Sequence, residues 1–120
     1  MDTIKMILQV VIALSIFNVW LVRYNKATKW RGGSAKSLKE EFQLYGLSDA
    51  VMGTVGFVKL LLAALLIAGV WLPFLVKPAA AGVALLMAGA VAMHMRVRDP
   101  LIKSLPAFTL LVLALIVFLL

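Results

Sequence analysis

The sequence predicts an all-α integral membrane protein: an antiparallel four-helix bundle with a short amphipathic interfacial helix between helices 1 and 2. Three observations lead to this fold class. Hydrophobic residues make up 64% of the 120 residues, whereas roughly half of a soluble domain is apolar. The sequence contains four apolar runs, each long enough to cross a bilayer as a helix. Only helices and closed barrels satisfy all backbone polar groups in lipid, so a single transmembrane domain over residues 1–120 is expected.

Composition and charge argue against several functional classes. The chain has no cysteine, which excludes disulfides and thiolate metal sites. One histidine and five acids leave little for a metal site, so no metal is expected. The formal net charge of +7 sits mostly in connecting segments, which favours the lipid bilayer over nucleic acid as the partner. No nucleophile–base pair can be assembled, so no catalytic residue is predicted and the chain is not expected to be an enzyme on its own.

The first apolar run predicts a helix over about residues 3–24. A cleaved signal peptide would need a small-residue cleavage site after a short apolar core. The run ends instead with Trp20 and Tyr24, which are typical of interface anchors, and with Arg23, which is typical of a stop signal. We therefore expect this helix to be retained.

A short amphipathic helix is predicted over about residues 37–45. Ser37 and Glu40 fit a capping box at its start, and Gly46 is a suitable residue to end it. We expect the helix to lie in the membrane interface or over the mouth of the bundle. Its apolar and aromatic residues on or near one face are Leu38, Phe42 and Tyr45.

The second span, about residues 49–72, is the one around which the others are arranged. Ser48 is a plausible N-cap. Lys59 lies near the middle of the span, where a lysine costs about 2.5–3.5 kcal/mol on insertion scales. Gly56 and Ala63 share its face, and small residues allow a neighbouring helix to come close. We therefore expect Lys59 to face the interior of the bundle or a wet cavity.

The third and fourth spans are predicted over about residues 78–96 and 100–120. The link before the third span is very short, so spans two and three should be antiparallel neighbours. Pro78 suits the first turn of a helix, and the many small residues that follow indicate close packing. Asp99 is expected to cap the fourth helix, and Pro106 is a point at which that helix could kink.

The basic residues predict how the protein lies in a bacterial inner membrane. Positive charge favours the cytoplasmic side, which places loops 1 and 3 in the cytoplasm and both termini outside. The alternative is that the first loop lies in the interface and its charges do not count. The basic residues of loop 1 are Arg23, Lys26, Lys29, Arg31, Lys36 and Lys39, those of loop 3 are Arg96, Arg98 and Lys103, and those of the other side are Lys5 and Lys77.

Asn18, Lys59 and His94 are predicted to reach one layer near the same end of the bundle, because helix side chains tilt toward the helix N-terminus. With Tyr24 and Trp30 above them, they are the candidate ligand-binding residues of a pocket for a ligand or a quinone headgroup. The competing interpretation is that Lys59 snorkels to the interface and that Asn18 ties two helices together. Taken alone, His94 would be an interfacial residue near lipid headgroups.

Five segments in a fixed order carry a family resemblance: NVW at 18–20, EFQLYGL at 41–47, GFVKLLLA at 56–63, MAGA at 87–90 and HMRVRDPL at 94–101. Over nearly the whole chain they resemble the DoxX-like family of small four-helix membrane proteins. The family takes its name from a subunit of an archaeal thiosulfate:quinone oxidoreductase, and most bacterial members have no assigned activity. One departure is that many relatives carry an acid where this chain has Lys59.

The resemblance implies a non-catalytic membrane subunit that binds a lipophilic small molecule, a quinone or a lipid, for a membrane or redox protein partner. The segment at 94–101 is also similar to the animal nicotinic-receptor chaperone, which implies a membrane-protein assembly factor as the alternative. A small multidrug-type proton exchanger would need an acid within an apolar run, and the runs contain none. The sequence leaves open whether the protein forms a homo-oligomer.

Overall fold

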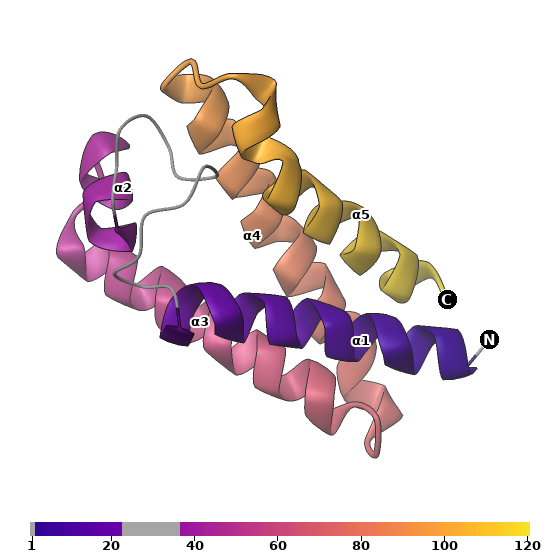
Figure 1. Ribbon diagram of the computed structural model, residues 1–120. Helices are drawn as coiled ribbons and strands as arrows, with labels where there is room; N and C mark the ends of the chain where they lie inside the picture. Colours follow the sequence, from indigo (N-terminus) through magenta and orange to yellow (C-terminus); the bar gives the residue numbers. More distant parts are fainter. Residues whose placement is uncertain (1, 23–36) are drawn as a thin grey trace.

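The computed structural model describes residues 2–22 and 37–120 as a bundle of helices (Figure 1). Four segments are long and apolar enough to span a membrane: Thr3–Leu21, Asp49–Ala68, Pro73–Arg96 and Leu101–Leu119. The described residues contain no strand, so the predicted fold class is confirmed. The elements in order are α1 (Asp2–Phe17), the π-helical turn η1 (Asn18–Val22), α2 (Leu38–Leu44), α3 (Asp49–Ala68), the 3-10 turn η2 (Pro73–Leu75), α4 (Val76–Arg96), the 3-10 turn η3 (Leu101–Ser104) and α5 (Leu105–Leu119).

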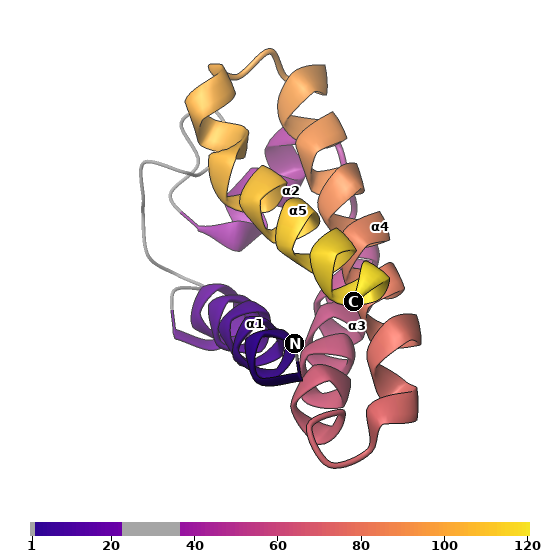
Figure 2. The same cartoon turned by 90° about the vertical axis from the view of Figure 1, so that its right-hand side faces the viewer.

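The four long helices form a closed ring of neighbours. α1 packs on α3, α3 on α4, α4 on α5, and α5 returns to α1. The start of α1 and the end of α5 lie close together at one end (Figures 1 and 2). At the other end the α1–α3 pair diverges from the α4–α5 pair, and α2 lies there (Figure 1). This divergence is what makes room for a site.

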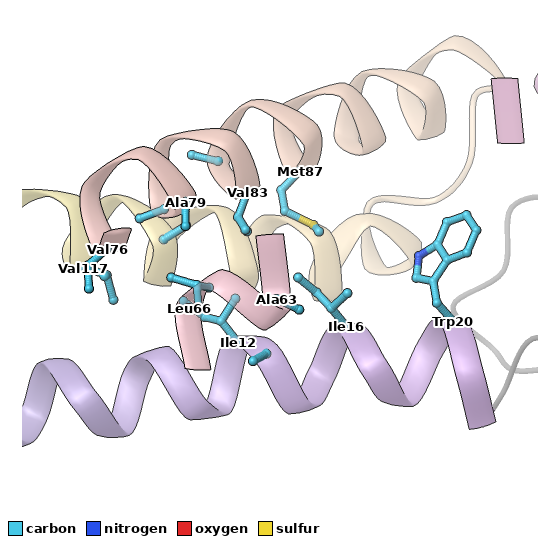
Figure 3. Packing of buried hydrophobic residues seen from close by; sticks show 14 of the residues in the cluster. Ile12, Ile16, Trp20, Ala63, Leu66, Val76, Ala79, Val83, Met87 and Val117 are labelled. Atoms are coloured by element: carbon cyan, nitrogen blue, oxygen red, sulfur yellow. The ribbon is translucent and has the colours of Figure 1, made fainter. Parts of the chain in front are cut away.

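The core is a strip of small and branched side chains along the inner faces of the long helices (Figure 3). Ile12, Leu66 and Val83 come from three different helices and are fully buried. Ala63 and Ala80 have no exposed surface either, and such small residues let helix backbones approach closely. Many other large apolar side chains face outward, as expected for helices surrounded by lipid.

The C-terminal end of α3 has partners for all four of its last carbonyl groups. Those of Leu65, Ile67 and Ala68 accept from backbone N–H groups of the following turn. The carbonyl of Leu66 accepts instead from the side chain of Gln9 on α1, at 2.9 Å. Gln9 is only 2% exposed. A helix end without partners is costly in lipid, so this single amide both caps α3 and ties α1 to it.

The predicted caps around α2 are confirmed. The hydroxyl of Ser37 accepts from the backbone N–H of Glu40, and that of Ser48 accepts from Val51 at the start of α3. After α2 the chain turns at Gly46 with φ +78°. The N–H groups of Gly46 and Leu47 donate to the carbonyls of Gln43 and Phe42 in the pattern of a Schellman motif, which needs a left-handed residue at position 46.

The prolines lie in first turns, although the helix starts differ from the predicted ones. α4 begins at Val76, so Pro78 occupies its third position. The 3-10 turn η3 occupies the expected start of the fourth helix, and α5 begins only at Leu105. Pro106 is therefore the second residue of α5, where no intrahelical N–H bond is lost, and it does not kink a continuing helix.

Replacing Gln9 with leucine should destabilise the bundle, because the Leu66 carbonyl would be left without its partner. An unsatisfied buried polar group costs about 1–3 kcal/mol, and we expect the free energy of unfolding in detergent to fall by that amount. The control is Gln43→Leu, the same substitution at an exposed position on α2. Equal stability of the two variants would contradict the capping role of Gln9.

Candidate functional site

A cavity of about 850 Å³ lies at the end of the bundle where the helix pairs diverge. α1, η1, α2, α3, α4, η3 and α5 all contribute to its wall, and most lining side chains are apolar. The polar lining residues are Ser15, Asn18, Glu41, Tyr45, Lys59, His94, Lys103 and Thr109. An apolar chamber with a few polar groups is the usual form of a small-molecule site.

The side chain of Lys59 packs over the ring of Trp20. Trp20 lies in the π-helical turn η1 and is 9% exposed. A Cβ added at Gly56 would lie 2.5 Å from the Trp20 ring, so only glycine lets the indole come this close to α3. The ammonium nitrogen of Lys59 lies 5.5 Å from the centre of that ring, within the reach of a cation–π interaction. The expectation that Trp20 anchors the interface is therefore wrong.

His94 is held by the turn that follows α4. Its Nδ1 lies 2.8 Å from Oδ2 of Asp99, and the two side chains are only 8% and 4% exposed. Arg98 takes a left-handed φ of 58°, which lets the Asp99 N–H donate to the His94 carbonyl at 3.0 Å. This conformation costs a residue with a side chain about 1–2 kcal/mol. Asp99 thus partners His94 rather than capping the next helix, and His94 lies inside the bundle rather than among headgroups.

Tyr45 connects α2 to this pair. Its hydroxyl donates to Oε1 of Glu41 at 2.7 Å, and its oxygen lies 3.4 Å from Nε2 of His94. The ring of Phe42 lies between those of Trp20 and Tyr45, in an edge-to-face arrangement 5.8 Å from Trp20 and tilted 6.1 Å from Tyr45 between centroids. A continuous row of polar and aromatic groups therefore runs from Asp99 to Lys59 along one wall of the cavity.

Three of the five candidate ligand-binding residues line this cavity: Asn18, Lys59 and His94. Lys59 leaves α3 on the side of the bundle interior and is half-buried, while the Asn18 side chain is exposed. Among the described residues these two are not hydrogen-bonded to each other. Tyr24 and Trp30 lie outside the described residues.

Sequence reasoning did not select Glu41, Tyr45 or Asp99 as site residues. The amphipathic pattern did predict Tyr45 on or near one face of the short helix, and all three residues lie in the segments 41–47 and 94–101 that carry the family resemblance. Glu41 supplies an acid from outside the apolar runs and lines the same cavity as Lys59. Within the described part of the chain, no group of three or more acidic or histidine side chains could hold a metal ion.

The site can hold an amphiphilic molecule by its polar end. Lys59 offers an ammonium donor, the aromatic row offers ring faces, and α4 and α5 offer an apolar wall. The polar and aromatic groups are clustered, because Trp20 contacts Phe42 and Tyr45 contacts His94. A bound headgroup would therefore meet donors, acceptors and rings together.

Comparison with known proteins identifies a family. A family model described as the DoxX-like family matches residues 7–119, which include every residue that lines the cavity. Searches of curated proteins and of solved structures found no significant match. Because the family model covers nearly the whole length, the chain belongs to the DoxX-like family.

Proposed function

We propose that this membrane protein is a non-catalytic subunit that binds a lipophilic small molecule, such as a quinone, for use by a redox partner protein. The observation that carries the proposal is the cavity of about 850 Å³. Its size falls in the range of about 300–1,000 Å³ that is typical of small-molecule pockets. Its apolar wall and clustered polar end also match a molecule with a polar head and an apolar tail.

The chemistry of the polar end supports a quinone over a purely apolar guest. A quinone headgroup is a planar ring whose carbonyl oxygens accept hydrogen bonds, and the Lys59 ammonium is a donor without acceptor capacity. The rings of Trp20 and Phe42 offer faces or edges against which such a ring can pack. The tail would then lie against the apolar side chains of α4 and α5.

The charge distribution supports a location in a bacterial inner membrane, with loops 1 and 3 on the cytoplasmic side. The cavity then opens near the cytoplasmic leaflet, because α2 and His94 lie at that end. The alternative function is assembly of other membrane proteins. A flat groove would have favoured that function, whereas the cavity is lined by all four long helices together with α2.

Lys59→Met should weaken quinone binding while leaving insertion and folding intact. The variant keeps the length of the side chain and removes the ammonium donor, and a hydrogen bond to a charged group is worth about 1.5–3 kcal/mol. We expect decylubiquinone to bind about tenfold or more weakly, measured by titration of the protein in nanodiscs. The matched control is Lys77→Met, since Lys77 is exposed at the start of α4 and does not line the cavity.

Two outcomes of that titration would count against the proposal. If Lys59→Met binds as the parent does but melts at a lower temperature, Lys59 is a structural tie. If phospholipid displaces decylubiquinone from the parent at equal concentration, the cavity is a lipid site rather than a quinone site.

A phenylalanine at position 89 should take up part of the cavity and weaken binding. Gly89 lines the cavity, and a Cβ added there would meet nothing within 4 Å, so the new ring has room and should not disturb the bundle. The control is Gly53→Phe, where an added Cβ also meets nothing but the position lies outside the cavity. Retained binding in Gly89→Phe would show that the ligand lies elsewhere.

The proposed orientation places the end of α5 outside the cytoplasm. Alkaline phosphatase fused after Leu120 should then be active, and a green fluorescent protein fused at the same position should be dark. The reverse pair of results would invert the orientation without affecting the binding proposal.

A further inference from the structure

We propose that the cavity opens sideways into the bilayer between α1 and α5, and that its occupant is a quinone with a long apolar tail, which enters through this opening and keeps its tail in it. The inference rests on the proposed function, because it specifies the class of molecule that the same cavity holds and the route by which that molecule arrives. It is carried by the exposed lining residues of α1 and α5 and by the depth at which they lie.

The first observation is that α1 and α5 line the cavity with side chains that are also exposed. On α1 these include Val11, which is 43% exposed. On α5 they include Leu105, which is 49% exposed, and Thr109. The two helices lie close together near the chain termini and diverge toward the end of α1 and the start of α5 (Figures 1 and 2). The cavity therefore reaches the outer surface of the bundle between them.

The opposite side of the bundle, between α3 and α4, is arranged differently. There α3 contributes Val55 and Lys59 to the lining, and both are half-buried. Leu85 and Gly89 of α4 are exposed, so only one of the two helices on this side presents exposed lining residues. The short helix α2 also packs against α3. We therefore assign the opening to the side between α1 and α5, where exposed lining side chains lie on both edges.

The depth of these residues places the opening in the hydrocarbon region of the bilayer. Val11 lies next to the middle of the span Thr3–Leu21, and Thr109 lies next to the middle of the span Leu101–Leu119. The hydrocarbon core provides no water to fill an open chamber. An opening at this depth therefore connects the cavity with lipid tails, and a lipid-soluble molecule reaches it by diffusing within the membrane.

The edges of the opening suit an apolar tail. On the α1 edge the hydroxyl of Ser15 donates to the Val11 carbonyl at 2.8 Å, so it needs no hydrogen-bond partner from the occupant. On the α5 side Leu110 and Leu113 line the cavity. Such surfaces gain contacts with an alkyl or isoprenoid chain and offer nothing that a second polar headgroup would require.

The polar end of the cavity and the opening lie at different positions along α1. The Lys59 ammonium contacts the ring of Trp20, which lies in the turn η1 that follows α1. Val11 lies farther back, in the middle of the span. A headgroup that accepts a hydrogen bond from Lys59 therefore has its tail directed toward Val11 and Thr109. Because a headgroup alone would leave the opening unfilled, the site favours long-chain quinones.

The opening can be tested with single labels, because the chain contains no cysteine. Val11→Cys and Thr109→Cys each give one position for a nitroxide label on the full chain in nanodiscs. We expect both labels to collide frequently with oxygen, which dissolves among lipid tails, and to be shielded from the water-soluble nickel complex NiEDDA. The controls are Leu14→Cys and Val112→Cys, whose positions are exposed on the same helices but do not line the cavity.

Bound quinone should change the two cavity labels only. Saturating decylubiquinone is expected to reduce the collisions with oxygen at Val11→Cys and Thr109→Cys, because its tail fills the opening, and to leave the control labels unchanged. Strong exposure of either cavity label to NiEDDA would overturn the proposal, since the opening would then be wet. A lack of response to bound decylubiquinone would also overturn it, because the tail would then lie elsewhere.

Val11→Trp narrows the opening and tests the tail directly. We expect decylubiquinone to bind this variant about tenfold or more weakly than the parent. The same dimethoxymethylbenzoquinone headgroup without a tail should bind both proteins equally. Leu14→Trp is the matched control and should bind both quinones as the parent does. Equal weakening of the two quinones by Val11→Trp would contradict the proposal, because the new ring would then displace the headgroup rather than the tail.

The outcomes separate the opening from the binding proposal. If decylubiquinone binds the parent but neither the cavity labels nor Val11→Trp show the expected change, the opening is wrong and the binding site stands. If decylubiquinone does not bind the parent at all, the proposed function fails and the assignment of the tail fails with it. The collisions of the labels in the ligand-free protein then still decide whether the cavity opens to lipid.

Discussion

Lipid offers no hydrogen-bond partner, so every polar group that enters the bilayer must find one within the protein. In this bundle Gln9 meets the Leu66 carbonyl, and His94 meets Asp99. Lys59 lies over the ring of Trp20. The Gln9 and Lys59 contacts each join two different elements, whereas outward-facing leucines would be equally well solvated by lipid tails. The few polar residues therefore determine which helix faces meet, and close packing of alanine and glycine follows from that choice.

The same contacts explain why the chamber lies at one end only. Near the termini the helices are drawn together by Gln9 and by fully buried residues such as Leu66 and Val76. Toward the other end the inner faces carry Lys59 and His94, and the partners of His94 are supplied by the segment after α2 and by the turn after α4. The partners of His94 lie outside the spans, and at this end the helix pairs diverge beside α2 (Figure 1).

Much of the fold could be predicted because its signals are local. The apolar runs indicate the spans, Ser37 and Ser48 indicate helix starts, and Gly46 indicates a left-handed turn. The arrangement of the site was harder to predict from the sequence. Lys59 and His94 could be assigned to one layer from helix geometry, but the partner of His94 depends on Arg98 adopting a conformation that sequence patterns assign to glycine. Trp20 could not be assigned correctly, because nothing in the sequence distinguishes a π-helical turn from an α-helical one.

Because of the π-helical turn, the position of Trp20 depends on the number of residues in the segment 18–22 more than on their identity. A π-helical turn accommodates one residue more than the α-helical turn it interrupts. Losing a single residue between 18 and 22 would restore an ordinary helix and rotate whatever follows by roughly 100°. The Trp20 indole would then lose its contact with Gly56, and the Lys59 ammonium would lose its contact with the Trp20 ring. Relatives that share this chamber should therefore tolerate exchanges of side chains in this segment far better than insertions or deletions.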